Sequence, residues 1–328
     1  MKKLLGIFLF MLALYGLILL ALDPDSWADN RRNLGQRIGL EGILCLGAGL
    51  LIIAGGVDLS IGSVVGLCAC VFCKLVLNEE YPLPIPVAAV LVMMLGALVG
   101  FVNGFLVTYF RVQAFVVTLC GLFLYRGAAR WVMDDEVPFI VTHVKPITDF
   151  CRGSVLEIPI YLWFLLILFA LASVFLHLTV HGRYFYAIGS NERAAAYSGI
   201  NTNFYKILAY VLCSMFASIY ALMHVVHYNS VEPPKTGETL ELYAIAGAVL
   251  GGCSLRGGEG STLGILIGTA IMRLLPNLTN MWEIPSTLEP TVVGGALLLC
   301  VIFDEQMRRG VGWRALFFRY ARSPRASG

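Results

Sequence analysis

Long apolar runs without charged residues constrain the fold of this chain most. Leu4 to Leu22 alone is a charge-free run of 19 residues, close to the ~20 that a helix needs to cross a ~30 Å hydrocarbon core. Apolar residues make up 58% of the chain and charged residues only 13%, about half the usual share of charge. So little charge cannot cover a water-exposed surface, and the sequence therefore predicts an all-α polytopic membrane protein.

Two stretches are too long to be single spans. Ile38 to Leu77 would measure about 60 Å as one helix, so we place a break at Gly55-Gly56-Val57-Asp58, where two glycines and a charge disfavour helix. Arg111 divides the second stretch. The sequence then predicts ten transmembrane helices, at residues 4–22, 38–54, 61–77, 87–110, 112–130, 159–180, 207–227, 241–255, 261–276 and 287–303. The spans starting at 61, 241 and 261 have short charge-free cores, and eight full crossings is the alternative.

Basic residues predict the orientation. With the N-terminus inside, thirteen lysines and arginines fall in cytoplasmic segments and six in outside loops, as the positive-inside rule requires. An even number of spans also places both termini in the cytoplasm. We therefore expect a transmembrane domain over residues 1–305, which begins with an uncleaved signal anchor. A basic cytoplasmic tail follows over 306–328, and we expect it to contact anionic membrane lipid.

Charge and motifs exclude several function classes. A net charge of +2 provides no basic field, so we expect no nucleic-acid partner. The chain carries no P-loop, kinase or Rossmann fingerprint, so we expect no nucleotide or other cofactor. Most of the nine cysteines lie inside apolar runs, where they act as small packing residues rather than as metal ligands.

Three segments are not ordinary spans, and the first is the predicted helix break. Its glycines permit a turn, and an acid between two spans must cap a helix, pair or meet water. A capped break and a gate are both consistent with this pattern. The residues that we assign to this gate or helix break are Gly55, Gly56, Asp58, Ser60 and Ser63.

The second segment is the long loop from His181 to Lys206, which we place in the cytoplasm. Residues 191–197 predict a short capped helix, and Gly199 ends it. This helix is too short to cross a membrane. It either lies on the lipid surface or docks a cytoplasmic partner.

The third segment, Gly251 to Ser261, is rich in glycine but has no lysine followed by Ser or Thr. A phosphate cradle is therefore a poor match. A tight turn between two spans, held by backbone N–H groups, fits better.

Together, the three segments resemble the permease subunits of monosaccharide (ribose-type) ATP-binding-cassette (ABC) importers. GGVDLSIGS is similar to the Gly-Gly-acid-Leu-Ser turn of that family, AIGSNERAAAYSGIN to its cytoplasmic coupling segment, and LYAIAGAVLGGCSLRGGEGSTLGILIG to its third signature. The resemblance covers residues from about 30 to 305. It departs from the EAA motif of other importers, since Glu192 and Gly199 are seven residues apart instead of six.

The resemblance implies the partners and the coupling site. It implies two cytoplasmic ABC ATPase subunits, a periplasmic sugar-binding protein and a second permease, identical or related, and it implies that this chain is not itself an enzyme. The chain would lie in the bacterial inner membrane, and its short helix would sit in a groove of the cytoplasmic ATPase. The coupling residues that the resemblance implies are Gly189, Asn191, Glu192, Arg193, Ala194, Ala195 and Gly199.

A neutral sugar is bound by hydroxyl, amide and aromatic groups. The candidates for a pathway lining are Asn103, Thr108, Gln113, Thr118 and Tyr125. Arg126 and Arg130, one helical turn apart, are either membrane-interface anchors or contacts for the binding protein.

Two other function classes compete with the importer. An ion-coupled secondary transporter needs buried acids or histidines at mid-membrane, and only Asp58 has apolar runs on both sides. A membrane enzyme would use metal-like histidine pairs, of which His224 with His227 and His177 with His181 are the best. The first pair lacks the glutamate of a zinc protease motif.

Overall fold

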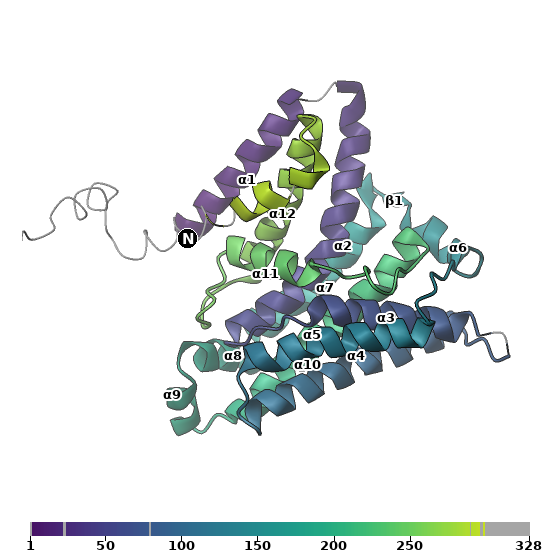
Figure 1. Cartoon of the computed structure of the whole chain (residues 1–328). Helices are drawn as coiled ribbons and strands as arrows, with labels where there is room; N and C mark the ends of the chain where they lie inside the picture. Colours follow the sequence, from purple (N-terminus) through teal and green to yellow (C-terminus); the bar gives the residue numbers. More distant parts are fainter. Residues whose placement is uncertain (1, 22–23, 79, 289, 296–297, 299–328) are drawn as a thin grey trace, which may run out of the picture.

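Helices make up most of the described chain (Figure 1). The computed structural model describes residues 2–21, 24–78, 80–288, 290–295 and 298. The helices are α1 (Lys2–Ala21), α2 (Trp27–Ile53), α3 (Ile61–Val76), α4 (Ile85–Thr108), α5 (Ala114–Met133), α6 (Val141–Cys151), α7 (Ile160–Ser173), α8 (Val180–Ser190), α9 (Glu192–Tyr197), α10 (Thr202–Tyr228), α11 (Leu240–Leu250) and α12 (Thr262–Met281).

Short elements complete the chain. Two 3-10 turns lie at Pro24–Ser26 and Ser286–Leu288, and one π-helical turn, Val174–Leu178, extends α7. Strands β1 (Ser154–Val155) and β2 (Ile158–Pro159) form a small antiparallel hairpin, with Ser154 opposite Pro159. The prediction of an all-α polytopic membrane protein is confirmed.

Seven of the described helices are long and apolar enough to cross a membrane: α1, α2, α4, α5, α7 with its π turn, α10 and α12. The break predicted after residue 54 is present, since α2 ends at Ile53 and α3 begins at Ile61. Helix α12 is a full span of 20 residues, not the short one that its charge-free core indicated. Helix α11, with 11 residues, is only about 16 Å long and cannot cross the membrane alone.

Two predicted boundaries were wrong. Residues 24–37 were expected to be an outside loop, yet α2 begins at Trp27. Its charged first turns contact the end of α6 and the turn of the hairpin, because Arg32 donates to the Arg152 carbonyl and Arg31 pairs with Glu157 at 3.0 Å. Residues 181–190 were expected in a loop and instead form most of α8. Of the tenth predicted span, 287–303, about half lies outside the described residues, and the tail, 306–328, lies wholly outside them.

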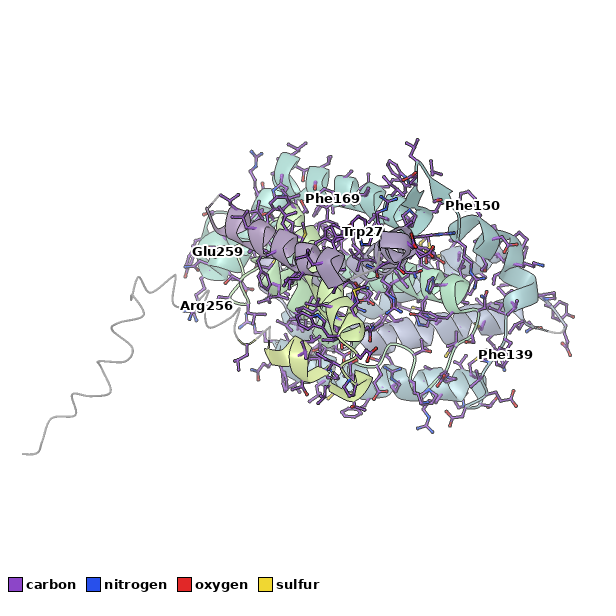
Figure 2. All side chains as sticks on the ribbon, turned by 90° about the horizontal axis from the view of Figure 1, so that it is seen from above. Trp27, Phe139, Phe150, Phe169, Arg256 and Glu259 are labelled. Carbon is purple, nitrogen blue, oxygen red and sulfur yellow. The ribbon has the colours of Figure 1, made fainter. Side chains whose placement is uncertain are left out.

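The body has two ends, which we call the α9 end and the α6 end. Figure 1 shows α9 at one end and α6 with β1 at the opposite end. Seen from above, Arg256 and Glu259 of the α11–α12 loop lie far from Phe139, just before α6, and from Phe150, near the end of α6 (Figure 2). By the predicted orientation, the α9 end is cytoplasmic.

Close helix contacts hold the core together. Helices α4 and α10 cross at Gly96, Gly100 and Gly104, and a Cβ on Gly100 would lie 2.5 Å from the Tyr210 carbonyl oxygen. Small residues at a spacing of four allow such an approach between spans. The three glycines therefore allow α4 and α10 to pack closely.

A buried ion pair joins α2 to α12. The Arg273 guanidinium lies 2.5 Å from the Glu41 carboxylate, and their side chains are only 10% and 18% exposed. Arg273 also lies over the ring of Tyr243 on α11, 5.2 Å from its centroid. This one cluster therefore ties three helices together within the apolar region.

Substitution of Arg273 by leucine leaves the Glu41 carboxylate buried without its cation. We expect a loss of about 3–5 kcal/mol in the free energy of unfolding, read as a lower melting temperature in detergent. The double variant Glu41→Leu with Arg273→Leu should recover part of this loss, because no buried charge remains. A double variant no more stable than Arg273→Leu would contradict the ion pair's role.

Candidate functional site

The three unusual segments of the sequence meet at one place, which we call the glycine junction: Gly55, Gly189, Gly257 and Gly258. Gly55 follows α2, Gly189 lies in the last turn of α8, and the other two lie in the α11–α12 loop. A Cβ on Gly55 would lie 3.3 Å from the Gly189 Cα, and one on Gly257 would lie 2.8 Å from the Gly55 Cα. Segments up to 200 residues apart in sequence therefore have their backbones in direct contact.

Only glycine fits at the junction. A Cβ on Gly189 would lie 2.0 Å from the Ile53 carbonyl oxygen and 2.4 Å from the Gly258 nitrogen. These two groups already bond to each other, since the Gly258 N–H donates to the Ile53 carbonyl at 2.9 Å. Gly55, Gly257 and Gly258 also have φ of +83°, +83° and +73°, the left-handed region that glycine adopts at little cost.

Local hydrogen bonds shape the helix break itself. Gly55 N–H donates to the Ile52 carbonyl and Gly56 N–H to the Leu51 carbonyl, both at 2.9 Å, the Schellman pattern that ends a helix. The Tyr210 hydroxyl donates to the Val57 carbonyl at 3.2 Å. The break is thus closed by bonds to its own helix and to α10.

A buried polar network follows the break. Asp58 Oδ1 accepts from the Ser60 N–H at 2.7 Å and from the Ser60 hydroxyl at 2.6 Å. Asn103 on α4 donates to Ser60 Oγ at 3.0 Å, and the Tyr125 hydroxyl on α5 donates to Asn103 Oδ1 at 2.7 Å. Ser63 donates to the Ser60 carbonyl. The network therefore joins the break to α4 and α5.

The pathway candidates separate into two groups. Asn103 and Tyr125 belong to the network. Thr108 and Thr118 donate to carbonyls of their own helices, Gly104 and Ala114, and Gln113 is exposed just before α5. The structure does not bring the second group together with the network.

Helix α9 has the predicted caps. Asn191 accepts from the Ala194 N–H at 3.0 Å, and Gly199, with φ of +83°, closes a Schellman motif with Ala195 and Ala196. Glu192 pairs with Lys206 at the start of α10, at 2.9 Å, which fixes α9 against that helix. The prediction of a short capped helix ending at Gly199 is confirmed.

The outer face of α9 is open. Arg193 and Ala194 are exposed, whereas Ala195 is buried against the body. Tyr197 is 93% exposed, a large aromatic side chain that our residue assignment from the sequence omitted. Its place on the exposed face of a six-residue helix could not be read from the sequence before the helix bounds were known.

The two arginines of α5 have different partners. Arg130 forms two bonds of 2.7 Å to Asp135, and its guanidinium holds the pKa of that carboxyl below the ordinary value. Arg126 instead donates to the carbonyl of Thr236 in the α10–α11 loop. Arg126 is therefore a structural contact inside the protein, not an interface anchor.

The histidine pairs do not form a metal centre in the described part of the chain. No group of three or more His, Cys, Asp or Glu side chains there could hold a metal ion. His177 contacts Thr262 Oγ1 at 3.2 Å and His181 contacts the Tyr205 hydroxyl at 3.0 Å, while His224 and His227 stack against tyrosines. These contacts are those of packed histidines.

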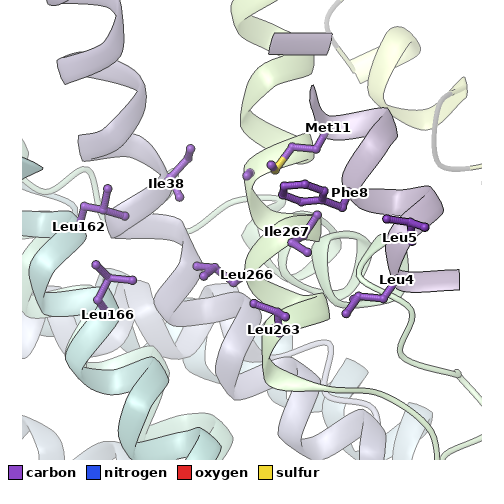
Figure 3. Close-up of a pocket in the computed structure, with 11 residues that line it drawn as sticks. Leu4, Leu5, Phe8, Met11, Ile38, Leu162, Leu166, Leu263, Leu266 and Ile267 are labelled. Carbon is purple, nitrogen blue, oxygen red and sulfur yellow. The ribbon is translucent and has the colours of Figure 1, made fainter. Parts of the chain in front are cut away.

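An open apolar groove of about 600 Å³ lies between α1, α2, α7 and α12. Figure 3 shows the leucines, isoleucines, Phe8 and Met11 that line it. With no polar side chain in its lining, the groove cannot recognise a hydrophilic solute. Its apolar lining is suited to contact with hydrocarbon chains.

Fold and junction together define a polytopic membrane protein in which α8, the helix directly before the open surface helix α9, contacts a broken span through Gly189. The family model described as "Branched-chain amino acid transport system / permease component" matches residues 34–302. The chain belongs to this family, and it is a transport permease of the bacterial inner membrane.

Several curated proteins are similar to the chain over most of its length. The ribose import permease protein RbsC of Escherichia coli (strain K12) is 36% identical over 301 residues, 88% of this chain and 90% of the relative. RbsC of Haemophilus influenzae is 34% identical, covering 87% and 88%. The autoinducer 2 import system permease protein LsrC of Enterobacter sp. (strain 638) is 33% identical, covering 97% and 91%. No solved structure gave a significant match. The resemblance to ABC importer permeases is confirmed.

Alanine at position 189 tests the glycine junction. Its Cβ would clash with backbone atoms of two other segments, so we expect Gly189→Ala to lower the melting temperature in detergent by several degrees. Gly127→Ala, on α5 with no atom within 4 Å of the added Cβ, is the matched control and should melt at or above the parent temperature. Equal melting of the two variants would show that the contact is not tight.

Proposed function

We propose that this chain is the membrane permease subunit of an ATP-driven importer that moves a small sugar delivered by a periplasmic binding protein. The observation that supports it most is α9, a capped helix with an exposed face at the predicted cytoplasmic end, which directly follows the end of α8 where Gly189 is in backbone contact with a broken span. Such a helix is suited to receive force from a soluble partner. The chain itself performs no covalent chemistry in this mechanism.

In the proposed mechanism, a cytoplasmic ATPase holds the exposed face of α9. When two ATPase subunits close on ATP, they displace α9 together with the end of α8. Gly189 touches both Ile53 and Gly258, so the displacement reaches the α2–α3 break and the α11–α12 loop at once. The network of Asp58, Ser60, Asn103 and Tyr125 then passes it to α4 and α5. A second permease, identical or related, completes the pathway.

The substrate class follows from the relatives. Their names assign ribose to RbsC and autoinducer 2 to LsrC. We propose a small polyhydroxylated molecule of this kind for the present chain, with ribose as the first compound to assay and autoinducer 2 as the second.

The ion-coupled alternative has little support in the structure. The two acids to consider are Glu41 and Asp58. The charge of Glu41, on α2, is compensated by Arg273, so Glu41 does not provide a cation site. Asp58 uses Oδ1 on Ser60, two residues further along the chain, while its Oδ2 is buried without a hydrogen-bond partner among the described residues, so Asp58 is the one residue on which this alternative rests. Purification from the native membrane in mild detergent separates the two mechanisms: an importer permease co-purifies with a soluble ATPase that carries a Walker motif. Solute uptake by this chain alone on an ion gradient would contradict the proposal.

Substitutions on α9 test the coupling site. Glu192→Lys replaces the partner of Lys206 by a like charge, and Gly199→Trp forces a bulky side chain into a left-handed position. In each variant we expect ATP hydrolysis by the reconstituted complex to continue while sugar uptake falls about tenfold or more, with normal membrane insertion. Arg32→Ala, whose side chain bonds the Arg152 carbonyl at the opposite end, is the control. Unchanged uptake in both α9 variants would remove the coupling assignment.

A further inference from the structure

The chain between α10 and α11 descends into the membrane-embedded body without forming a helix. It starts at the α6 end, where the Ile140 N–H donates to the Asn229 carbonyl at 3.2 Å and the Thr148 hydroxyl to Asn229 Oδ1 at 3.1 Å. Residues 230–239 then consist of a bridge residue and hydrogen-bonded turns. The sequence prediction placed this stretch, 228–240, in an outside loop.

The depth of this stretch follows from its contacts with α3. Lys74 and Asp134, 3.9 Å apart, mark the α6 end of α3 and α5. A Cβ on Gly66 would lie 2.8 Å from the Thr236 carbonyl oxygen, and one on Gly62 would lie 2.1 Å from the Gly237 carbonyl oxygen. Along α3, these glycines lie ~15 and ~21 Å below Val76. In a ~30 Å core, Thr236 and Gly237 lie near or beyond the middle.

One face of this descending segment is buried and the other is polar. Val231, Thr236 and Gly237 are buried, and they pack toward α3 and α5. The exposed positions are Glu232, Pro234, Lys235, Glu238 and Thr239. Irregular backbone and charged side chains at membrane depth are tolerated only inside protein or against water. The exposed face of this segment therefore does not face lipid.

Two groups hold the segment in place. Arg126 on α5 donates to the Thr236 carbonyl, and its guanidinium also lies close to Gly66 on α3. Glu241 is 9% exposed and packs against Gly62. On the same turn of α5, Phe123 and Leu124 are 69% and 66% exposed and face outward as lipid-contacting residues do. Arg126 is thus a positioning residue for the segment.

Thr239 has a backbone conformation that its own helix does not explain. It precedes α11 with φ of +64°, and its side chain makes no cap bond to that helix. A β-branched residue in the left-handed region is an outlier, and such strain clusters at ligand contacts. Its hydroxyl and the Glu238 carboxylate are neighbours on the exposed face, able to donate to and accept from the hydroxyl groups of a polyol.

We propose that segment 232–239 forms a wall of the solute pathway, and that Glu238 and Thr239 contact the hydroxyl groups of the transported sugar at mid-membrane. The identity of the solute rests on the proposed function. The proposal that the segment borders a water-filled pathway does not. A broken backbone with a short helix at membrane depth is also how solute sites are built in other transporters.

Cysteine accessibility tests the wall directly. Glu238→Cys and Thr239→Cys are made in a background that lacks Cys120 and Cys300, and the whole complex in membrane vesicles is treated with a charged, membrane-impermeant thiol reagent. Leu124→Cys, on the exposed apolar face two residues from Arg126, is the matched control. We expect the two pathway positions to react at least about tenfold faster than the control, because a charged reagent does not enter hydrocarbon. Rates equal to that of Leu124→Cys would overturn the proposal.

Uptake tests the contact with solute. Glu238→Gln and Thr239→Ala should each raise the half-saturating solute concentration by about tenfold while the ATPase activity of the complex is unchanged. Glu232→Gln, on the same segment nearer the α6 end, should resemble the parent. Parent-like uptake in both variants would overturn the contact. If the parent complex imports no sugar, the proposed function is contradicted. Fast labelling of Glu238→Cys and Thr239→Cys in the same complex would still support the proposal that the segment lines a water-filled pathway.

Discussion

Backbone hydrogen bonding in a water-free core is the constraint on which this structure depends. A helix that breaks at a buried position, as α2 does beside the buried Ala54 and Asp58, exposes N–H and carbonyl groups, each of which costs several kcal/mol unless it finds a partner. The break after α2 is tolerated because its carbonyls and amides are satisfied by its own last turn, by Tyr210 and by Gly258. The same requirement explains why glycines gather there: partners this close leave no room for a Cβ.

The few charged residues also have structural roles. With 13% charged residues in the chain, those inside the apolar body hold its irregular parts together. Arg273 and Glu41 join α2 to α12, Arg126 holds the segment before α11, and Asp58 organises the start of α3. The charges at the surface, such as Glu192 with Lys206, fix the helix that the proposed mechanism moves. A long-range path from surface to core is therefore built from few polar contacts and several glycines.

Much of this architecture could be predicted from the sequence, because the apolar periods and glycine breaks are local signals. The break at Gly55, the short helix ended by Gly199 and the packing at Gly100 all follow from residues close in sequence. The predictions were wrong where the structure of a segment involves a contact with residues far away in the sequence. Within the helical residues 27–37, Arg31 pairs with Glu157 of the distant hairpin, and within α12, Arg273 pairs with Glu41.

The candidate site shows the same division. Its three segments were identified from the sequence, as were Asn103 and Tyr125, but their meeting at Gly189 requires contacts over more than 100 residues. Thr108 and Thr118 were chosen for their hydroxyl groups, which in a helix bond the carbonyl four residues earlier. The descent of residues 230–239 had no local signal that separates it from an outside loop.

The central claim is that displacement of α9 reaches the helix break through the glycine junction. Hydrogen–deuterium exchange on the reconstituted complex, compared with and without a non-hydrolysable ATP analogue, measures this most directly. The account predicts that exchange changes together in residues 186–199 and in residues 54–60. A change confined to 186–199, with the break unaffected, would contradict it.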